Sequence, residues 1–387
     1  METIKNDVKS FTPVDWMLII GAASLFLPHV ISVVLLSVIC FIAFLKYDIL
    51  KNIFAQKGKA VTYSFFLLEV IVSLVYKNWI GAGIMMSFFL LVIYIAFYRE
   101  HISQKVFAYI LDISLILSCV VCVYALFQFN QISVTNGYKF TDFHIFNSPK
   151  RRIYGTFQNA NIFALMLEFM LAVCLYRFLQ TKQFLLKVWY VVIALFQFSV
   201  LFLTGCRAAL VPLIFVIPIL LGMNGFKKLL GLYLVCIVAL LVVVFNYPKL
   251  IPRFNDFSTI ANRVKIWRTA IKGIKLYPLF GNGPWTYFHI YQRFHGHKAV
   301  FCHNIYLDCI SCFGLVGTAL FLGYVKTLID HVRSVRKENR FFYSLVLSIL
   351  AIVLIHGFVD GTINPLKTNV FLPVSYTHLT LPTILRV

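Results

Sequence analysis

Runs of apolar residues, each about as long as a membrane-spanning helix, recur along almost the whole chain. A helix needs about 20 such residues to cross the hydrocarbon core of a bilayer. Of the 387 residues, 60% are hydrophobic and only 13% are charged, a balance that excludes an ordinary soluble domain. The alternating segments of about ten residues that mark a membrane β-barrel are missing. The sequence therefore predicts an all-α, polytopic membrane protein.

Eleven apolar segments are expected to span the membrane as helices. The first two are separated only by Pro28, so they could form a short hairpin. The expected spans are 14–27, 29–45, 61–76, 80–98, 106–129, 157–178, 188–204, 208–222, 229–245, 303–325 and 341–359.

The end of the chain, 374–387, differs from the rest because no apolar span can be built from it. Its first residues, VSYTHLTLPT, resemble the translation of a sequencing-library adapter, and we expect this tail to be non-native. We therefore treat 1–373 as a single transmembrane domain. We also expect the intact chain to continue into a twelfth span.

The positive charges of the short connections indicate how the chain is oriented. If the N-terminus lies in the cytoplasm, most Lys and Arg of these connections also fall on the cytoplasmic side. This distribution agrees with the positive-inside rule. The two longer connections, 130–154 and 247–302, then face the extracytoplasmic side, and the second forms one large loop.

Both extracytoplasmic loops are basic, although cations on that side are unfavourable for insertion. An anionic ligand at the outer face would explain them, and attraction to anionic lipid headgroups is the alternative. The first loop ends in Lys150, Arg151 and Arg152. The second contains Lys249, Arg253, Arg263, Lys265, Arg268, Lys272, Lys275, Arg293 and Lys298 against the single acid Asp256.

Within the second loop, the segment 260–275 has the pattern of a basic amphipathic helix. Its apolar residues recur at helical spacing, and basic residues occupy the rest of its surface. Such a helix could lie on the membrane or cover a cavity. The apolar positions are Ile260, Val264, Trp267, Ile271 and Ile274.

Several polar residues stand at the ends of expected spans. Arg207 lies between two spans, where its planar guanidinium suits phosphate oxygens, unless it simply reaches the headgroups. Asn159 and Asn161 open a span, where they could contact a sugar or phosphate or cap the helix. His303 and Asn304 open another, at a position where proton transfer can be controlled.

Other groups have less specific patterns. Gly314 and Gly317 would lie on one helix face and allow a neighbouring helix to approach closely. His356 and Asp360 are four residues apart, so they can share a helix face. The carboxylates Glu69, Asp112, Glu168 and Asp308 lie within or near apolar runs, where a structural role is as plausible as a functional one. The scattered cysteines have no partners in soluble loops, and we predict no zinc site.

The order of the motifs is more specific than any one of them. Gly-Thr-Phe-x-Asn-x-Asn starts at Gly155, Gly-Cys-Arg-Ala at Gly205, Asn-Arg-x-x-x-Trp at Asn262, and Pro-Leu-x-Gly-x-Gly at Pro278. His-Asn, nine residues, and Gly-x-x-Gly follow from His303. This succession resembles the O-antigen ligase and O-antigen polymerase superfamily over about 154–323. Ala160 and Cys206 replace the Pro and Ser that are frequent in that family.

The resemblance implies about twelve spans and an enzyme of the bacterial inner membrane. Its reaction would transfer a glycan from an undecaprenyl-diphosphate carrier to a hydroxyl acceptor at the outer face, without a metal or another cofactor. By motif position it implies catalytic roles for His303, Arg207 and Arg263. The candidate substrate-binding residues are Asn304, Asn159, Asn161, Arg268, Arg152 and Asp360.

The expected partners are the lipid-linked glycan donor, a glycan or lipid acceptor and membrane lipids, but not nucleic acid. The sequence leaves open whether the protein is a ligase or a polymerase. A transporter or flippase of anionic glycolipids is an alternative, although such proteins typically contain internal repeats. A lipid-binding scaffold is another, but it gives no reason for the ordered motifs.

Overall fold

The computed structural model describes residues 10–47, 59–139, 152–157, 159–248, 257–336 and 339–361. In these ranges the regular elements are helices, and no strand occurs among them. This confirms the all-α prediction. The tail 374–387 lies outside the described residues, as do Lys150, Arg151, Lys249, Arg253 and Asp256.

Each of the eleven expected spans contains an apolar helix. Seven helices are long and apolar enough to cross a membrane, and four are shorter, so the number of spans remains a prediction. The long ones are α3 (His29–Lys46), α6 (Trp79–His101), α7 (Gln104–Thr135), α8 (Ala160–Gln180), α9 (Phe184–Leu203), α11 (Lys227–Asn246) and α14 (Ile305–Val335). The shorter ones are α2 (Pro13–Ser24), α5 (Lys59–Val75), α10 (Leu210–Met223) and α15 (Arg340–His356).

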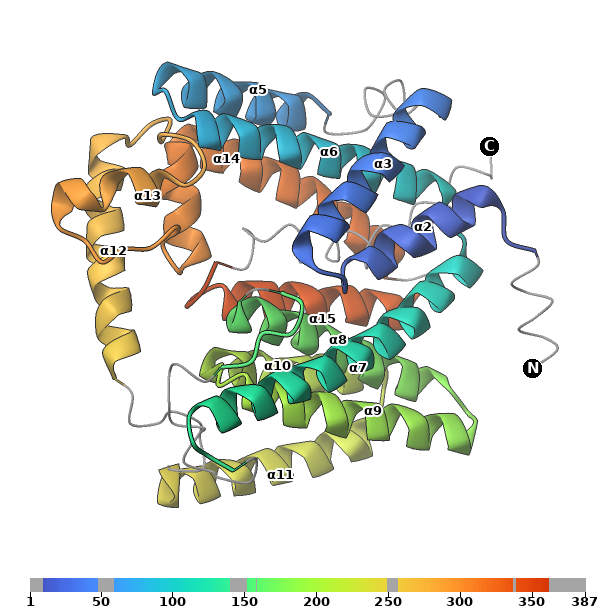
Figure 1. The fold of residues 1–387 in the computed structure, drawn as a ribbon. Coiled ribbons are helices and arrows are strands. Elements are labelled where there is room, and N and C mark those ends of the chain that lie inside the picture. The colour runs from blue at the N-terminus through green and yellow to red at the C-terminus, as the bar shows by residue number, and fades with distance from the viewer. Residues whose placement is uncertain are drawn as a thin grey trace.

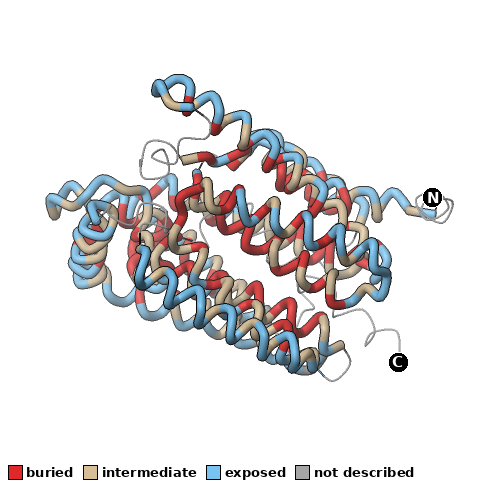
Figure 2. Tube along the Cα trace, turned by 90° about the horizontal axis from the view of Figure 1, so that it is seen from below, coloured by how far each residue is buried: buried red, intermediate tan, exposed pale blue. Residues whose placement is uncertain are grey.

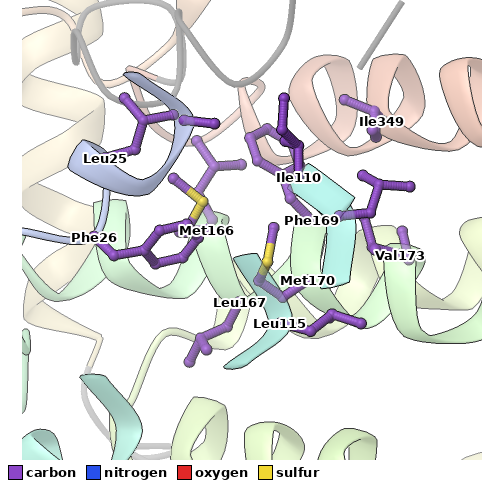
Figure 3. Packing of buried hydrophobic residues seen from close by; sticks show 14 of the residues in the cluster. Leu25, Phe26, Ile110, Leu115, Met166, Leu167, Phe169, Met170, Val173 and Ile349 are labelled. Atoms are coloured by element: carbon purple, nitrogen blue, oxygen red, sulfur yellow. The ribbon is translucent and has the colours of Figure 1, made fainter. Parts of the chain in front are cut away.

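The core forms around α8, which is the most deeply buried of the long helices. Figure 3 shows Met166 and Phe169 of α8 close to Ile110 of α7, Leu25 at the end of α2, and Ile349 of α15. Figure 2 shows that buried positions follow the inward faces of the helices. The most apolar window of α11 has no buried residue, as expected where a helix contacts lipid rather than protein.

A partly buried ion pair links the helices at one end of the core. Arg177, in the last turn of α8, places Nε 2.9 Å and Nη2 2.5 Å from the two carboxylate oxygens of Asp112 in α7. Tyr190 of α9 donates a hydrogen bond of 3.3 Å to the same carboxylate. Such a bidentate pair is among the strongest polar contacts, so Asp112 has a structural role that links three helices.

The connection between α11 and α14 contains α12 (Ser258–Leu276), α13 (Thr286–Ile290) and the short 3-10 helix η4 (Gln292–Phe294). The amphipathic helix predicted over 260–275 is therefore confirmed as a helix. Figure 1 shows α12 standing across one end of the bundle, beside the first part of α14, while the long apolar helices run away from it.

The predicted apolar stripe is not the side of α12 that is buried. Ile260 and Ile271 remain 50% and 46% exposed. The buried residues are instead Ile266, Thr269, Ala270 and Gly273. Small side chains on this face let α13 approach closely, because a Cβ on Gly273 would lie 2.0 Å from Cδ1 of Ile290. Val264, Trp267 and Ile274 of the stripe are half-buried, so the stripe borders the buried face rather than forming it.

The two glycines of α14 have different roles, contrary to the expectation that both face a neighbouring helix. The helix breaks at Gly314, which has φ 61° and ψ −169°. The loop that precedes α13 fills the break: Leu315 and Val316 donate to the carbonyls of Pro278 and Leu279, both at 2.9 Å. Gly317 faces the neighbouring helix α5 as expected, because a Cβ there would lie 2.2 Å from Oε1 of Glu69.

Candidate active site

The site is built at the start of α14, where Asn304 caps the helix. Its Oδ1 accepts hydrogen bonds of 3.0 Å from the backbone of Tyr306 and Leu307, as a helix cap does. Its Nδ2 donates 2.9 Å to the carbonyl of Phe358, just beyond α15. Asn304 therefore joins the start of α14 to the end of α15.

His303 lies directly before this cap, outside the helix in which the sequence placed it. Its φ of 49° is in the left-handed region, which is uncommon for residues other than glycine and often marks functional positions. The side chain is about a quarter exposed, and its ring centroid lies 4.7 Å from that of Phe301. The imidazole is thus partly enclosed but still accessible from outside.

Asp360 fixes the orientation of this imidazole. His303 Nδ1 lies 2.9 Å from Asp360 Oδ1, and the backbone N–H of Gly361 donates 2.8 Å to the same oxygen. The carboxylate is almost completely buried. Because Nδ1 faces Asp360, Nε2 is the ring nitrogen that remains on the opposite side for a substrate.

Two further residues predicted for the site, Asn161 and Arg263, approach the second oxygen of Asp360, and a third, Arg152, reaches it through Asn161. Asn161 of α8 donates from Nδ2 to Oδ2 and accepts at Oδ1 from the guanidinium of Arg152. The Nη2 of Arg263, on α12, lies 4.0 Å from Oδ2. Arg152 also donates 2.8 Å from Nε to the carbonyl of Thr204. The fold therefore joins five separate segments around one carboxylate.

The surrounding charges keep this carboxylate ionised. Burial on its own would raise the pKa of Asp360, because a charge is unfavourable in an apolar environment. The hydrogen bond and charge of His303, with the charges of His356 and Arg263, act in the opposite direction and hold this pKa well below its usual range. Asp360 is therefore a charged partner for His303 at neutral pH.

A second buried pair lies close to Asp360. His356, the last residue of α15, places Nδ1 2.6 Å from Oε1 of Glu168 on α8, and its Nε2 lies 3.9 Å from Sγ of Cys206. The expectation that His356 and Asp360 share a helix face is wrong, because α15 ends at His356 and Asp360 lies beyond it. The two side chains have different partners.

The sequence did not connect Glu168 and Cys206 with the site. Glu168 was noted only as a carboxylate in an apolar run, although it follows Asn161 by seven residues and so lies on the same face of α8. Cys206 precedes Arg207, which begins the short 3-10 helix η2 (Arg207–Ala209) between α9 and α10. The turn that carries Arg207 is therefore next to His356.

The remaining candidates lie around this cluster rather than within it. Asn159 caps α8, and its Oδ1 accepts a hydrogen bond of 2.8 Å from the backbone of Asn161. Arg268 is exposed and points to another side of α12 than Arg263. Asp308 accepts 3.1 Å from the backbone of Cys302 and stabilises the turn before α14. Among the described side chains, no group of three or more His, Cys, Asp or Glu could hold a metal ion.

A histidine held by a buried carboxylate lies with arginines at one end of the apolar bundle. The ordered motifs therefore share one location. Residues 192–322 match the O-antigen ligase family. The match confirms that this part of the chain resembles the O-antigen ligase and polymerase superfamily. It supports an O-antigen ligase-like membrane glycosyltransferase at the level of the family. No curated protein matches the chain.

The O-antigen ligase match begins in α9 and ends in α14. It includes Arg207, Arg263 and His303 but not Asp360. Arg152, Asn159 and Asn161 also lie outside the matched residues. Two contacts therefore connect these flanking residues to the O-antigen ligase region: His303 with Asp360, and Asp360 with Asn161.

Proposed function

We propose that the protein transfers a glycan from an undecaprenyl-diphosphate carrier to a hydroxyl acceptor at the outer face of the bacterial inner membrane. The observation that carries this proposal is the contact of 2.9 Å between His303 and the buried carboxylate of Asp360, beside Arg263. The O-antigen ligase match supports the same class of reaction.

In the proposed reaction, His303 acts as the general base. The acceptor oxygen attacks the anomeric carbon of the donor sugar while Nε2 of His303 takes the hydroxyl proton. The bond from the sugar to the phosphate breaks, and the diphosphate leaves with the bonding electrons. Asp360 holds the imidazole in orientation and stabilises the positive charge that it gains.

Arg207 and Arg263 are proposed to bind the diphosphate, whose negative charge grows as the bond breaks. Positioned cations stabilise such a charge most effectively where water is excluded. Arg152 and Asn161 then act mainly by holding Asp360, while Asn159, Asn304 and Arg268 remain candidate contacts to the substrates. We propose that the reaction needs neither a metal ion nor another cofactor.

The proposed topology follows from the charges of the connections. The N-terminus lies in the cytoplasm, and α12 and α13 lie on the extracytoplasmic side, where they cover the site and restrict the access of water. An acceptor in the form of another glycan would make the protein a polymerase. A lipid acceptor, such as a lipid A core, would make it a ligase.

A flippase of anionic glycolipids is the second candidate, and the break of α14 at Gly314 favours it. Interrupted membrane helices are common at the binding sites of transporters. The break here is filled by the backbone of the loop before α13, which is typical of a fixed structure rather than an open pathway.

A transfer assay separates the two candidates. The purified protein in nanodiscs would be given an undecaprenyl-diphosphate glycan and a hydroxyl acceptor, and the product would be followed by mass. We expect His303→Asn to bind the donor normally but to lose about 10²–10⁴-fold in transfer rate, because asparagine cannot act as the base. Nearly normal product from His303→Asn would overturn the proposed role, and glycolipid movement across vesicles without any product would favour the flippase.

A further inference from the structure

A row of four basic residues runs along α12 outside the contacts around Asp360. Lys265, Arg268, Lys272 and Lys275 follow one another at intervals of three and four residues, so they lie on one face of the helix. All four are exposed. We refer to these four residues as the basic row.

The basic row is distinct from the face of α12 that serves the active site. At 100° per residue, Arg263 lies about 160° around the helix from the centre of the row. Arg263 approaches Asp360, whereas the row points away from it. The cations of the row are therefore not needed to explain how a diphosphate is bound beside His303.

The basic row also points away from both apolar faces of the helix. Its centre lies about 130° from the centre of the buried face, which consists of Ile266, Thr269, Ala270 and Gly273. It lies about 100° from the centre of the predicted apolar stripe, to which the exposed Ile260 and Ile271 belong. A helix at a membrane surface turns its apolar face toward lipid. In that orientation the row lies along the side of the helix, between the lipid-facing stripe and water.

Neighbouring residues extend the positive surface. The Nζ of Lys272 lies 5.8 Å from the ring centroid of Phe294 in η4, and the guanidinium of Arg293 lies 5.9 Å from the same ring. Arg293 and Lys298 are exposed. The sequence from 257 to 307 contains neither Asp nor Glu that could neutralise these charges. Lys272 and Arg293 meet at this ring, so positive charge extends beyond the row into η4.

From this charge and orientation we infer that the basic row binds an acidic glycan, one that carries carboxylates or phosphodiesters, and holds it beside the active site. This inference rests on the proposed transfer reaction and specifies the chemical class of its acceptor. Repeated anionic groups along a polymer can contact several cations of the row at once. Mobile lysine and arginine side chains tolerate the variable spacing of such groups.

The direct test is a binding measurement that needs no catalysis. Protein with His303→Asn, in nanodiscs of neutral lipid, would be titrated with polygalacturonate, with poly(glycerol phosphate) and with neutral dextran of similar length. We expect binding of at least one acidic polymer, weakening with salt, and little binding of dextran. The triple variant Lys265→Gln, Lys272→Gln and Lys275→Gln should bind the acidic polymer about tenfold more weakly, because three exposed charge contacts are lost.

The matched control changes three exposed lysines elsewhere, Lys182→Gln, Lys227→Gln and Lys228→Gln, and should leave polymer binding unchanged. The inference is overturned if neither acidic polymer binds, if dextran binds equally well, or if both triple variants behave alike. It is also overturned if the α12 triple variant binds the acidic polymer normally but retains less phosphatidylglycerol in detergent. The row would then contact lipid. The transfer assay with neutral acceptors tests the reaction separately.

Discussion

The imidazole of His303 and the carboxylate of Asp360 face each other at 2.9 Å, although 57 positions separate them in the chain. The contact forms because Asn304 links the start of α14 to the carbonyl of Phe358, two residues before Asp360. The backbone N–H of Ile305 also donates 2.8 Å to the carbonyl of Gly357. Two helix ends are thereby locked together, and the pair is held at their junction.

The ionised state of Asp360 predicts how stability depends on pH. Its folded-state pKa is lower than the unfolded-state value of about 3.9, so the carboxylate stabilises the fold above about pH 4. This contribution disappears as the pH falls through the folded-state pKa. Asp360→Asn should therefore melt at a lower temperature than the wild type at pH 7, and the difference should shrink below about pH 4.

Thermal unfolding in detergent between pH 3 and 8 measures this effect. Asp330→Asn is a suitable control, because Asp330 is exposed and pairs only loosely, at 3.7 Å, with Arg333. A difference between wild type and Asp360→Asn that grows toward acid would mean that the carboxylate is protonated in the fold at neutral pH.

Replacing the two arginines by lysine tests whether they bind diphosphate through planar, forked contacts. Lysine keeps the charge but lacks the fork, so Arg207→Lys and Arg263→Lys should each lose on the order of 10²-fold in transfer rate. Arg333→Lys, at the exposed end of α14, should transfer normally. Transfer close to normal in both site variants would indicate that these arginines reach lipid headgroups instead.

The Glu168–His356 pair predicts a non-additive effect on stability. Removing one partner leaves the other buried without its counterpart, so Glu168→Leu or His356→Leu alone should cost about 3–5 kcal/mol. Replacing both by leucine should cost much less than the sum, since two apolar side chains suit the interior. A double-mutant cycle of unfolding measures the coupling, and simple additivity would argue against a direct pair.

Gly314 should resist substitution more than a glycine elsewhere in the bundle. Alanine would have to adopt a backbone conformation that only glycine occupies readily, at about 1–3 kcal/mol. Its Cβ would also lie 2.4 Å from the carbonyl carbon of Leu279. Gly231→Ala in α11, where no atom lies within 4 Å of the added Cβ, should be tolerated. Equal melting temperatures for the two variants would show that the break at Gly314 is not needed.

Local features of the sequence predicted the helices well, because each needs only a run of residues with the right polarity. The eleven apolar runs became helices, and the capping role considered for Asn159 was found, since a cap depends on residues within one turn. The amphipathic sequence pattern predicted where α12 lies in the chain. The packing of Gly273 against Ile290 decided which side of this helix is buried.

The sequence by itself determined the membrane class, the ordered motifs and most of the candidate site residues, because composition and spacing express them directly. Only the tertiary structure decided that Asp360 orients His303, that Asn161 and Arg152 hold Asp360, and that Glu168 pairs with His356. These contacts join residues far apart in the chain. Which distant groups meet depends on how the helices pack and where α14 breaks. A local sequence pattern determines neither of these.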